Sequence, residues 1–212
     1  MMQVCKIDAC AKINIGLRVG SPGADGYHPI LSLFHSVSLF DTLSFARHPA
    51  GQGILVRGGF DCPGEETTIY KAIQAFRTAT GIVDGLEAEV GKHIPAMAGL
   101  GGGSADAAAT LVALDRLFDT GFSKGELVDI GAQIGSDVPF FLFGGAALVS
   151  GRGDVVEPIA PRTDFGILLL YPGFGVSTKW AYSRLDEWRA GNHAFRTEEG
   201  GPSQPLRESE RM

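Results

Sequence analysis

The chain has few cysteines and no surplus of basic residues. Its 212 residues include three cysteines, Cys5, Cys10 and Cys62, whose spacing matches no metal-ligand motif. We expect them to be reduced, as is typical of a cytoplasmic protein. With 18 lysines and arginines against 24 aspartates and glutamates, the formal net charge is −6. This balance argues against a nucleic acid or an anionic membrane as partner. It leaves a phosphorylated small molecule open, because a few amides and cations suffice to bind one.

The sequence also lacks long apolar runs and the best-known phosphate-binding motifs. Lys6, Asp8 and Lys12 interrupt the N-terminal region, so we expect neither a signal peptide nor a membrane span. No Gly-Lys-Ser or Gly-Lys-Thr triplet occurs, which excludes a Walker loop. The glycines between Gly99 and Asp106 do not have the G-x-G-x-x-G spacing of a dinucleotide fingerprint.

One glycine-rich stretch stands out, Pro-Ala-Met-Ala-Gly-Leu-Gly-Gly-Gly-Ser-Ala-Asp at residues 95–106. It follows a strand-like segment and leads into an alanine-rich helical pattern at residues 105–118. Glycines let a backbone turn sharply and approach a bulky ligand, and a helix start presents unpaired N–H groups. The stretch therefore predicts an anion site, most simply for phosphate. The alternative is a tight turn with Ser104 as helix N-cap, which needs no ligand.

Four polar residues near the N-terminus are candidates for a site. Residues 11–19 alternate as a half-buried strand, with Lys12 and Asn14 on the face opposite the apolar residues. This face could equally be solvated. Tyr27 and His28 follow a turn-rich loop, where they could stack on a flat ring or simply pack.

A single carboxylate in the middle of the chain is a further candidate. Asp137 lies between a glycine turn and an apolar run, in Gly-Ser-Asp-Val-Pro-Phe-Phe at residues 135–141. A carboxylate in such a place could act as a general base, or it could be an ordinary turn or cap residue.

The remaining patterns predict a mixture of strands and helices. We expect a helix over 67–80 capped by Gly81, and a second helix over 127–134 after a capping box at 123–126. The expected strands are 31–45 with a turn near Asp41 and Thr42, 54–57, 86–90, a hairpin around 147–154, and a core strand at 165–171. A last helix is expected over 177–189 and a polar, disordered tail over 192–212.

Three stretches together resemble one enzyme family. They are Ala-Lys-Ile-Asn-Ile at 11–15 with Asp-Gly-Tyr-His at 25–28, the glycine-rich stretch at 95–109, and the segment 135–141. The glycine-rich stretch is similar to that of the galactokinase, homoserine, mevalonate and phosphomevalonate (GHMP) kinase superfamily. The Asp-Gly-Tyr-His stretch is similar to that of 4-diphosphocytidyl-2-C-methyl-D-erythritol kinases. Residues 151–154 and 175–178 also fit, and the resemblance covers about residues 5–190.

The resemblance implies an α+β GHMP-kinase fold. It would have an N-terminal lobe like domain 2 of ribosomal protein S5 over residues 1–160, and an incomplete ferredoxin-like lobe over 161–190. The expected tail would take up 191–212. No second glycine-rich turn of the kind that closes over the site in the family is found. We therefore expect a shortened or truncated chain.

The resemblance also implies an activity, the transfer of the γ-phosphoryl group of ATP to the 2-hydroxyl of 4-diphosphocytidyl-2-C-methyl-D-erythritol. Mg²⁺ would arrive with ATP rather than at a dedicated metal site. Asp137 would be the base, with Lys12 beside it. The acceptor would contact Asn14, Tyr27, His28, Thr178 and Tyr182. The residues wrapping ATP would be Pro95, Ala96, Met97, Ala98, Gly99, Leu100, Gly101, Gly102, Gly103, Ser104 and Ala105.

Two other readings stay open. The chain could be a nucleotide-binding protein without catalytic activity, because its second lobe is incomplete. It could also be a GHMP kinase for another small alcohol such as mevalonate or homoserine, although the Asp-Gly-Tyr-His stretch argues against this. We expect a monomer or a homodimer.

Overall fold

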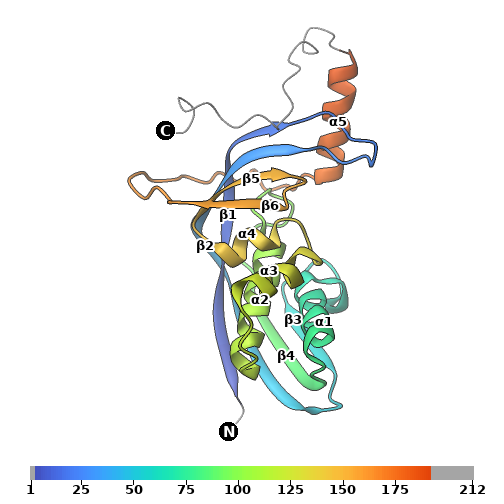
Figure 1. The fold of residues 1–212 in the computed structure, drawn as a ribbon, viewed down its shortest axis with the longest axis vertical. Coiled ribbons are helices and arrows are strands. Elements are labelled where there is room, and N and C mark those ends of the chain that lie inside the picture. The colour runs from blue at the N-terminus through green and yellow to red at the C-terminus, as the bar shows by residue number, and fades with distance from the viewer. Residues whose placement is uncertain (1–2, 192–212) are drawn as a thin grey trace.

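A computed structural model describes residues 3–191, so the expected polar tail at 192–212 lies outside the described residues. The described chain forms six strands, five α-helices and one short 3₁₀ helix (Figure 1). In chain order these are β1 (Val4–Val19), β2 (Ile30–Ala50), β3 (Ile54–Gly58), η1 (Gly64–Glu66), α1 (Thr68–Thr80), β4 (Asp84–Gly91), α2 (Gly102–Phe118), α3 (Lys124–Ala132), α4 (Val138–Phe143), β5 (Ala146–Gly151), β6 (Val155–Ile159) and α5 (Thr178–Gly191).

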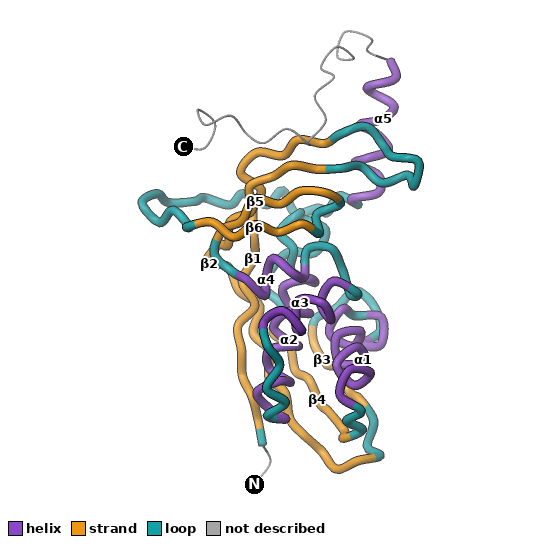
Figure 2. Tube along the Cα trace, in the orientation of Figure 1, coloured by secondary structure: helices purple, strands orange, loops and turns teal. Residues whose placement is uncertain are grey.

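All six strands belong to one mixed sheet built around the long strand β2 (Figure 2). β1 pairs antiparallel with β2 along most of its length. On the other edge of β2, β5 pairs with residues 30–35 and β4 pairs with residues 42–50. The neighbours β3 and β4 are parallel, and β6 completes the β5 hairpin. Between β5 and β4, residues 36–41 of β2 pair with no strand on this edge, and this interruption makes room for a loop.

The hydrophobic core lies between the sheet and the helices. α2 packs against β1 and β2, and α1 packs against α2. Much of the buried face of α2 is alanine, including Ala105, Ala107 and Ala108, and these small side chains let the helix approach the sheet closely. Phe45, Phe76 and other large apolar side chains fill the space beside it. The packing of this long apolar helix thus fixes the position of its first turn and of the loop that leads into it.

Local signals in the sequence account for the helix ends. Thr67 caps α1 by accepting a hydrogen bond from the backbone N–H of Tyr70, at 3.2 Å. Gly81 ends α1 in a left-handed conformation. The capping box of Ser123 and Glu126 is confirmed at the start of α3, with both reciprocal bonds present.

The expected turn near Asp41 and Thr42 is wrong, because β2 runs through both residues without interruption. The period of β2 is mixed because its partner changes from β5 to β4 and its register with β1 shifts between Cys10 and Ala11. Asp41 is fully buried, whereas a turn aspartate would be exposed.

The predicted buried side of β1 is also wrong. Ile15 and Leu17 are exposed, whereas Lys12 is only 6% exposed. A register shift between Ile15 and Leu17 breaks the simple alternation, and the segment next to the helices buries the polar face instead.

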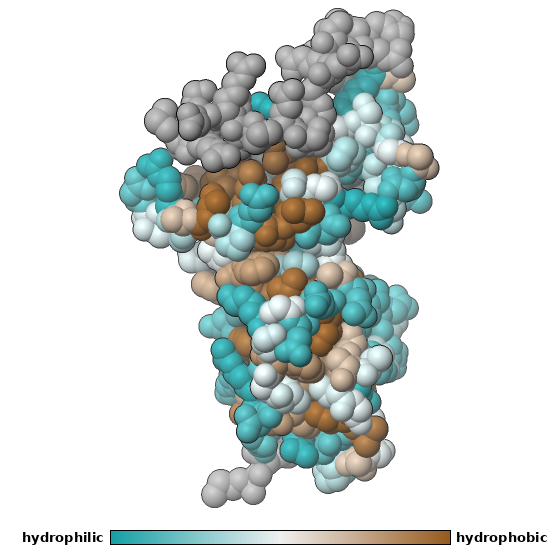
Figure 3. Space-filling view, viewed as in Figure 1, coloured by the Kyte–Doolittle hydropathy of each residue, from teal (hydrophilic) through white to brown (hydrophobic). Residues whose placement is uncertain are grey.

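Residues 165–171 were expected to form a core strand, and the structure shows neither strand nor burial there. Leu168 and Leu170 are 82% and 85% exposed. A strand needs a neighbour for its N–H and C=O groups, and none of the strands in residues 3–191 pairs with this segment. Figure 3 shows that apolar side chains also reach the surface on the visible face of the upper part of the molecule. Within residues 3–191, none of the helices has the length and apolar character needed to cross a membrane.

Candidate active site

The glycine-rich loop lies between the end of β4 and the start of α2, in the interruption along the edge of β2. Its backbone is tied to β1 by a 2.9 Å hydrogen bond from the N–H of Lys12 to the carbonyl of Leu100. The helix begins at Gly102 with Gly101 as N-cap, so the alternative interpretation of Ser104 as the N-cap is wrong. The first N–H groups of α2 therefore belong to the glycines themselves.

Only glycine fits at the N-cap of α2. Gly101 has φ of 72°, and a Cβ there would lie 2.8 Å from Cζ of Phe141 and 3.1 Å from Cγ of Lys12. The absence of a side chain thus allows the loop to lie directly against the aliphatic stem of Lys12. A positive helix end and a lysine are placed side by side, which suits an anionic ligand.

Lys12 and Asp137 come together from segments 125 residues apart. Lys12 Nζ lies 3.7 Å from Asp137 Oδ2, 2.7 Å from Asn14 Oδ1 and 4.4 Å from the ring centre of Phe34. Burial lowers the pKa of Lys12, and the charge of Asp137 acts in the opposite direction. Asp137 precedes α4, but its carboxylate makes no capping bond there, which argues against the helix-cap alternative. The carboxylate of Asp137 therefore interacts with Lys12 and does not cap α4.

Asn14 orients the lysine in this structure. Its amide oxygen accepts from Lys12, and its amide nitrogen donates to Ser32 Oγ at 2.9 Å. Ser32 in turn donates to the carbonyl of Gly16 at 2.8 Å. This chain fixes the amide of Asn14 with its oxygen toward the ammonium group.

Of the residues expected to bind an acceptor, Tyr182 lies within range of the Asp137 charge, and His28 packs against Tyr182. His28 Nε2 lies 2.8 Å from Asp186 Oδ1. The centre of the His28 ring lies 4.9 Å from the centre of the Tyr182 ring. Burial and the charge of Asp137 raise the pKa of Tyr182. The Tyr27 ring is largely exposed, with the Arg152 guanidinium 4.4 Å above it. Thr178, the remaining candidate, lies exposed at the first position of α5.

A second segment covers part of the loop. The N–H of Val176 donates to the carbonyl of Met97 at 2.8 Å. A Cβ at Gly175 would lie 2.6 Å from Cβ of Met97, so this close approach also requires glycine. Gly175 and Val176, from one of the stretches that fit the family resemblance, therefore contact the glycine loop at its start.

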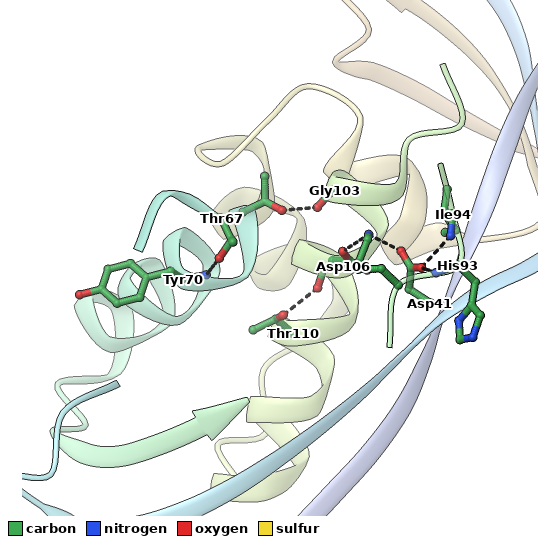
Figure 4. A network of polar contacts seen from close by, with 10 residues as sticks. Asp41, Thr67, Tyr70, His93, Ile94, Gly103, Asp106 and Thr110 are labelled. Carbon is green, nitrogen blue, oxygen red and sulfur yellow. Dashed lines mark hydrogen bonds and ion pairs between the residues drawn. The ribbon is translucent and has the colours of Figure 1, made fainter. Parts of the chain in front are cut away.

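Sequence reasoning missed a buried cluster of charges behind the loop, Asp41, Lys92 and Asp106. Figure 4 shows Asp41 and Asp106 turned toward each other, with His93 and Ile94 beside Asp41. Lys92 Nζ bonds to Asp41 Oδ2 and, at 2.7 Å, to Asp106 Oδ2. One signal was available for Asp106, since it occurs at the start of an alanine-rich, largely apolar helical pattern.

The pKa values in this cluster are displaced by burial and by the neighbouring charges. Burial raises the pKa of Asp106 to about 6 against the opposing effect of Lys92, and Asp41 adds to the rise. Burial acts to lower the pKa of Lys92, but its bonds to Asp106 and Asp41 outweigh this and raise it.

Comparison with known proteins places this architecture in a class. The family of GHMP kinases, through its N terminal domain, matches residues 67–145, which span α1, β4, the glycine loop and α2 to α4. A solved homoserine kinase from Cytophaga hutchinsonii has the same fold, with a TM-score of 0.63 and 20% identity over 86% of this chain and 60% of that one. The fold is therefore that of a GHMP kinase.

More similar proteins narrow the class. A 4-diphosphocytidyl-2-C-methyl-D-erythritol kinase of Treponema pallidum (strain Nichols) is 42% identical over 194 residues, 91% of this chain and 67% of its own length. One from Pelotomaculum thermopropionicum is 46% identical over 82% of this chain and 61% of its own length. A solved 4-(cytidine 5'-diphospho)-2C-methyl-D-erythritol kinase is 34% identical with a TM-score of 0.71, covering 95% of this chain and 68% of that one. The chain belongs to the 4-diphosphocytidyl-2-C-methyl-D-erythritol kinase family, and it spans about three fifths of the length of the Pelotomaculum relative.

Proposed function

We propose that the protein transfers the γ-phosphoryl group of ATP to the 2-hydroxyl of 4-diphosphocytidyl-2-C-methyl-D-erythritol, a step of the methylerythritol phosphate route to isoprenoids. The observation that carries the proposal is the pairing of Lys12 with Asp137 at 3.7 Å beside the glycine loop. Phosphoryl transfer asks a protein mainly to position its reactants and to neutralise charge. A base, a cation and a row of amide groups in one place are suited to both tasks.

ATP would bind with its phosphates along the glycine loop, residues 95–105. The close approach of Gly101 to Lys12 and Phe141 supports this placement, since a side chain there would fill the space. The amide groups at the start of α2 are fixed dipoles that need no reorganisation during the reaction. Among residues 3–191, no group of three His, Cys, Asp or Glu side chains could hold a metal ion. From the family resemblance, Mg²⁺ would enter with ATP and supply further charge neutralisation.

The catalytic step assigns one role to each member of the pair. Asp137 accepts the proton of the 2-hydroxyl as that oxygen attacks the γ-phosphorus, and the bond from the γ-phosphorus to the bridging oxygen of ADP breaks. Lys12 offsets negative charge on the phosphoryl group in transfer. Since the ammonium group is buried, its effect on nearby charges is screened little by water.

The acceptor would lie on the side of Lys12 and Asp137 that faces α5. His28 and Tyr182, with ring centres 4.9 Å apart, would contact its base, and the exposed ring of Tyr27 offers a surface for stacking. Asn14 and Thr178 would complete the contacts. These roles follow from the family resemblance, and the proximity of Tyr182 to Asp137 supports them.

An assay of ADP release with the cytidyl diphosphate acceptor tests the proposal. We expect turnover by the wild type, loss of nearly all turnover in Asp137→Ala, and ATP binding in both. Asp129→Ala is the matched control, because Asp129 is an exposed aspartate on the neighbouring helix α3. Wild-type ADP release no faster than that of Asp137→Ala would refute the proposal.

A second candidate is a protein that binds the nucleotide without turning it over. The exposed, unpaired segment 165–171 favours it, since the part of the fold around the site is then incomplete. Calorimetric binding of ATP together with no ADP release would support this candidate. Mevalonate and homoserine in the same assay test the reading with another acceptor.

A further inference from the structure

The buried charges behind the glycine loop belong to three separate segments. Asp41 comes from the part of β2 that lacks a neighbour on one edge. Lys92 directly follows β4 and therefore stands where the chain enters the loop. Asp106 lies in the first turns of α2, where the chain leaves the loop. The cluster thus contacts both ends of the loop and the strand behind it.

Each end of the loop is held by a different set of bonds. Asp41 Oδ1 accepts from the backbone N–H groups of His93 and Ile94, at 2.5 and 2.8 Å. Lys92 connects Asp41 to Asp106 across the loop, since its ammonium group donates to both carboxylates. One ammonium group therefore sets the distance between the segment before the loop and the helix after it.

The residues held by these hydrogen bonds pack directly against the glycines of the loop. A Cβ at Gly102 would lie 2.9 Å from Cγ2 of Ile94 and 3.6 Å from Asp41 Oδ2. The first residue of α2 therefore rests on the residue whose N–H is held by Asp41. On the other side, Thr68 Oγ1 donates to the carbonyl of Gly103 at 2.6 Å. A shift of Lys92 or Asp41 would be transmitted to the amide groups of these glycines.

Stability alone gives a poor reason for this cluster. Asp41 and Asp106 are buried, the three charges sum to −1, and Asp106 Oδ1 has no hydrogen-bond partner. Buried ion pairs are often no more stabilising than apolar side chains of similar volume. The cluster makes better sense as a device that fixes a geometry.

We propose that Lys92 is a positioning residue that, through Asp41 and Asp106, fixes the two ends of the glycine loop so that its amide groups stay aimed at one anion site. The inference deepens the proposed function, because that site would hold the phosphates of ATP. Lys92 itself need not contact the nucleotide. Its effect is on the order of the loop, and this order can be measured without any substrate.

Hydrogen exchange of the loop amides tests the proposal directly. In Lys92→Met we expect exchange at residues 96–104 to accelerate by about tenfold or more, because the loop loses the link between its ends. Asp106→Asn should keep the loop ordered, since its amide oxygen can still accept from Lys92, whereas Asp106→Ala should accelerate exchange as Lys92→Met does. Should Lys92→Met fail to fold, the comparison of Asp106→Asn with Asp106→Ala decides the question alone.

Asp115→Ala is the matched control. Asp115 lies on the same helix, and its Oδ1 accepts from Thr120 Oγ1 and from the N–H of Phe122, at 2.7 and 2.9 Å. Asp115 therefore holds the loop that follows α2, whereas Asp41, Lys92 and Asp106 hold the loop that precedes α2. We expect Asp115→Ala to accelerate exchange near residues 119–122 and to leave residues 96–104 unchanged. Equal acceleration of 96–104 in both variants would show general loosening of α2 and overturn the proposal.

Kinetics supply the second readout. In Lys92→Met we expect KM for ATP to rise about tenfold, with KM for the acceptor within about twofold of wild type, because only the phosphate loop is misplaced. Unchanged loop exchange in a folded Lys92→Met protein overturns the inference. A wild type that orders its loop through Lys92 but releases no ADP would leave the inference intact and refute the proposed function instead.

Discussion

At the scale of single residues, the site is defined by polar groups placed where water is largely excluded. Lys12 shows this most clearly. The alternation of residues 11–19 was compatible with a solvated lysine, and that reading is wrong. Phe34 lies under the ammonium group, while Asn14 and Asp137 approach it from the side. Burying a cation costs free energy because the charge loses its hydration, so a role in binding or catalysis gives the buried lysine a reason.

Replacing this lysine tests its role. In Lys12→Met we expect kcat to fall by about three orders of magnitude, because the variant removes charge stabilisation next to the transferred group. Lys6→Met is the control, since Lys6 lies on the same strand but is exposed. The measurement is ADP release at saturating ATP and acceptor, and equal loss in the two variants would contradict the role of Lys12.

Asp106 predicts a dependence of stability on pH. Its pKa is raised from 3.8 to about 6 in the folded protein, chiefly by burial, with Lys92 and Asp41 as the charges facing it. The folded state therefore binds this proton more tightly than the unfolded state. The stabilisation is complete below about pH 4 and is lost as the pH rises through about 6.

Between pH 5 and 7 this group should lower the free energy of unfolding by about 1 kcal/mol. In Asp106→Asn that contribution is absent. The difference in unfolding free energy between variant and wild type, measured with urea, should thus move in favour of the variant by this amount over the same range. A difference that stays constant from pH 5 to 7 would contradict the raised pKa.

At the scale of elements, the glycine loop depends on one conformation at the start of α2. Gly101, the N-cap of α2, has a positive φ of 72°. Gly121, which lies beyond the other end of α2, has a similar φ of 69°. A Cβ at Gly121 meets nothing within 4 Å, whereas one at Gly101 meets Phe141 and Lys12. The two glycines therefore separate backbone strain from steric displacement of the site.

Alanine at either glycine should destabilise the fold by about 1 kcal/mol, because both require a positive φ. Only Gly101→Ala should also lower kcat/KM for ATP, by about tenfold or more, since Lys12 must move to accommodate the methyl group. Thermal unfolding measures the first effect and steady-state kinetics the second. Similar kinetic losses in the two variants would argue against the close contact of the loop with Lys12.

The elements that could be predicted from the sequence are those with local signals. The cap at Gly81, the capping box that begins at Ser123 and the hairpin of β5 and β6 follow from short-range chemistry, and all are confirmed. The sequence wrongly predicted a turn inside β2, because the burial pattern of this strand depends on which strand pairs with each part of it. The same limit applies to the site. Family resemblance suggested Lys12 and Asp137, but no local pattern links Asp41, Lys92 and Asp106, which meet only after the sheet has formed.

At the scale of the whole molecule, α5 joins the sheet through a few polar contacts and through Tyr182, which packs against the apolar cluster that contains Ile30, Phe34 and Phe140. None of its described residues is buried. Arg189 donates to the carbonyls of Val19 and Gly20, at 2.6 and 3.0 Å, and Asp186 bonds to His28. The helix thus reaches the side of the molecule where the acceptor is proposed to bind, and polar contacts together with the Tyr182 ring hold it there.

The segment before α5 leaves a large apolar surface exposed, and this predicts self-association. Residues 165–171 are almost entirely apolar, and their backbone is unpaired in the described chain. Such segments tend to pair with another copy. We expect light scattering to show a mass that rises with protein concentration. The double variant Leu168→Glu with Leu170→Glu should shift this rise to concentrations at least about tenfold higher, because charges oppose pairing.

Val83→Glu is the control, since Val83 is an isolated exposed apolar residue between α1 and β4. It should leave the concentration dependence as it is in the wild type. Association that responds equally to all the variants would assign the effect to net charge, and a wild type of constant monomeric mass would show that the exposed segment is tolerated. In the expected case, the apolar segment 165–171, which has no neighbouring strand in the described chain, determines how copies of the chain associate, separately from the site on β1, α2 and α4.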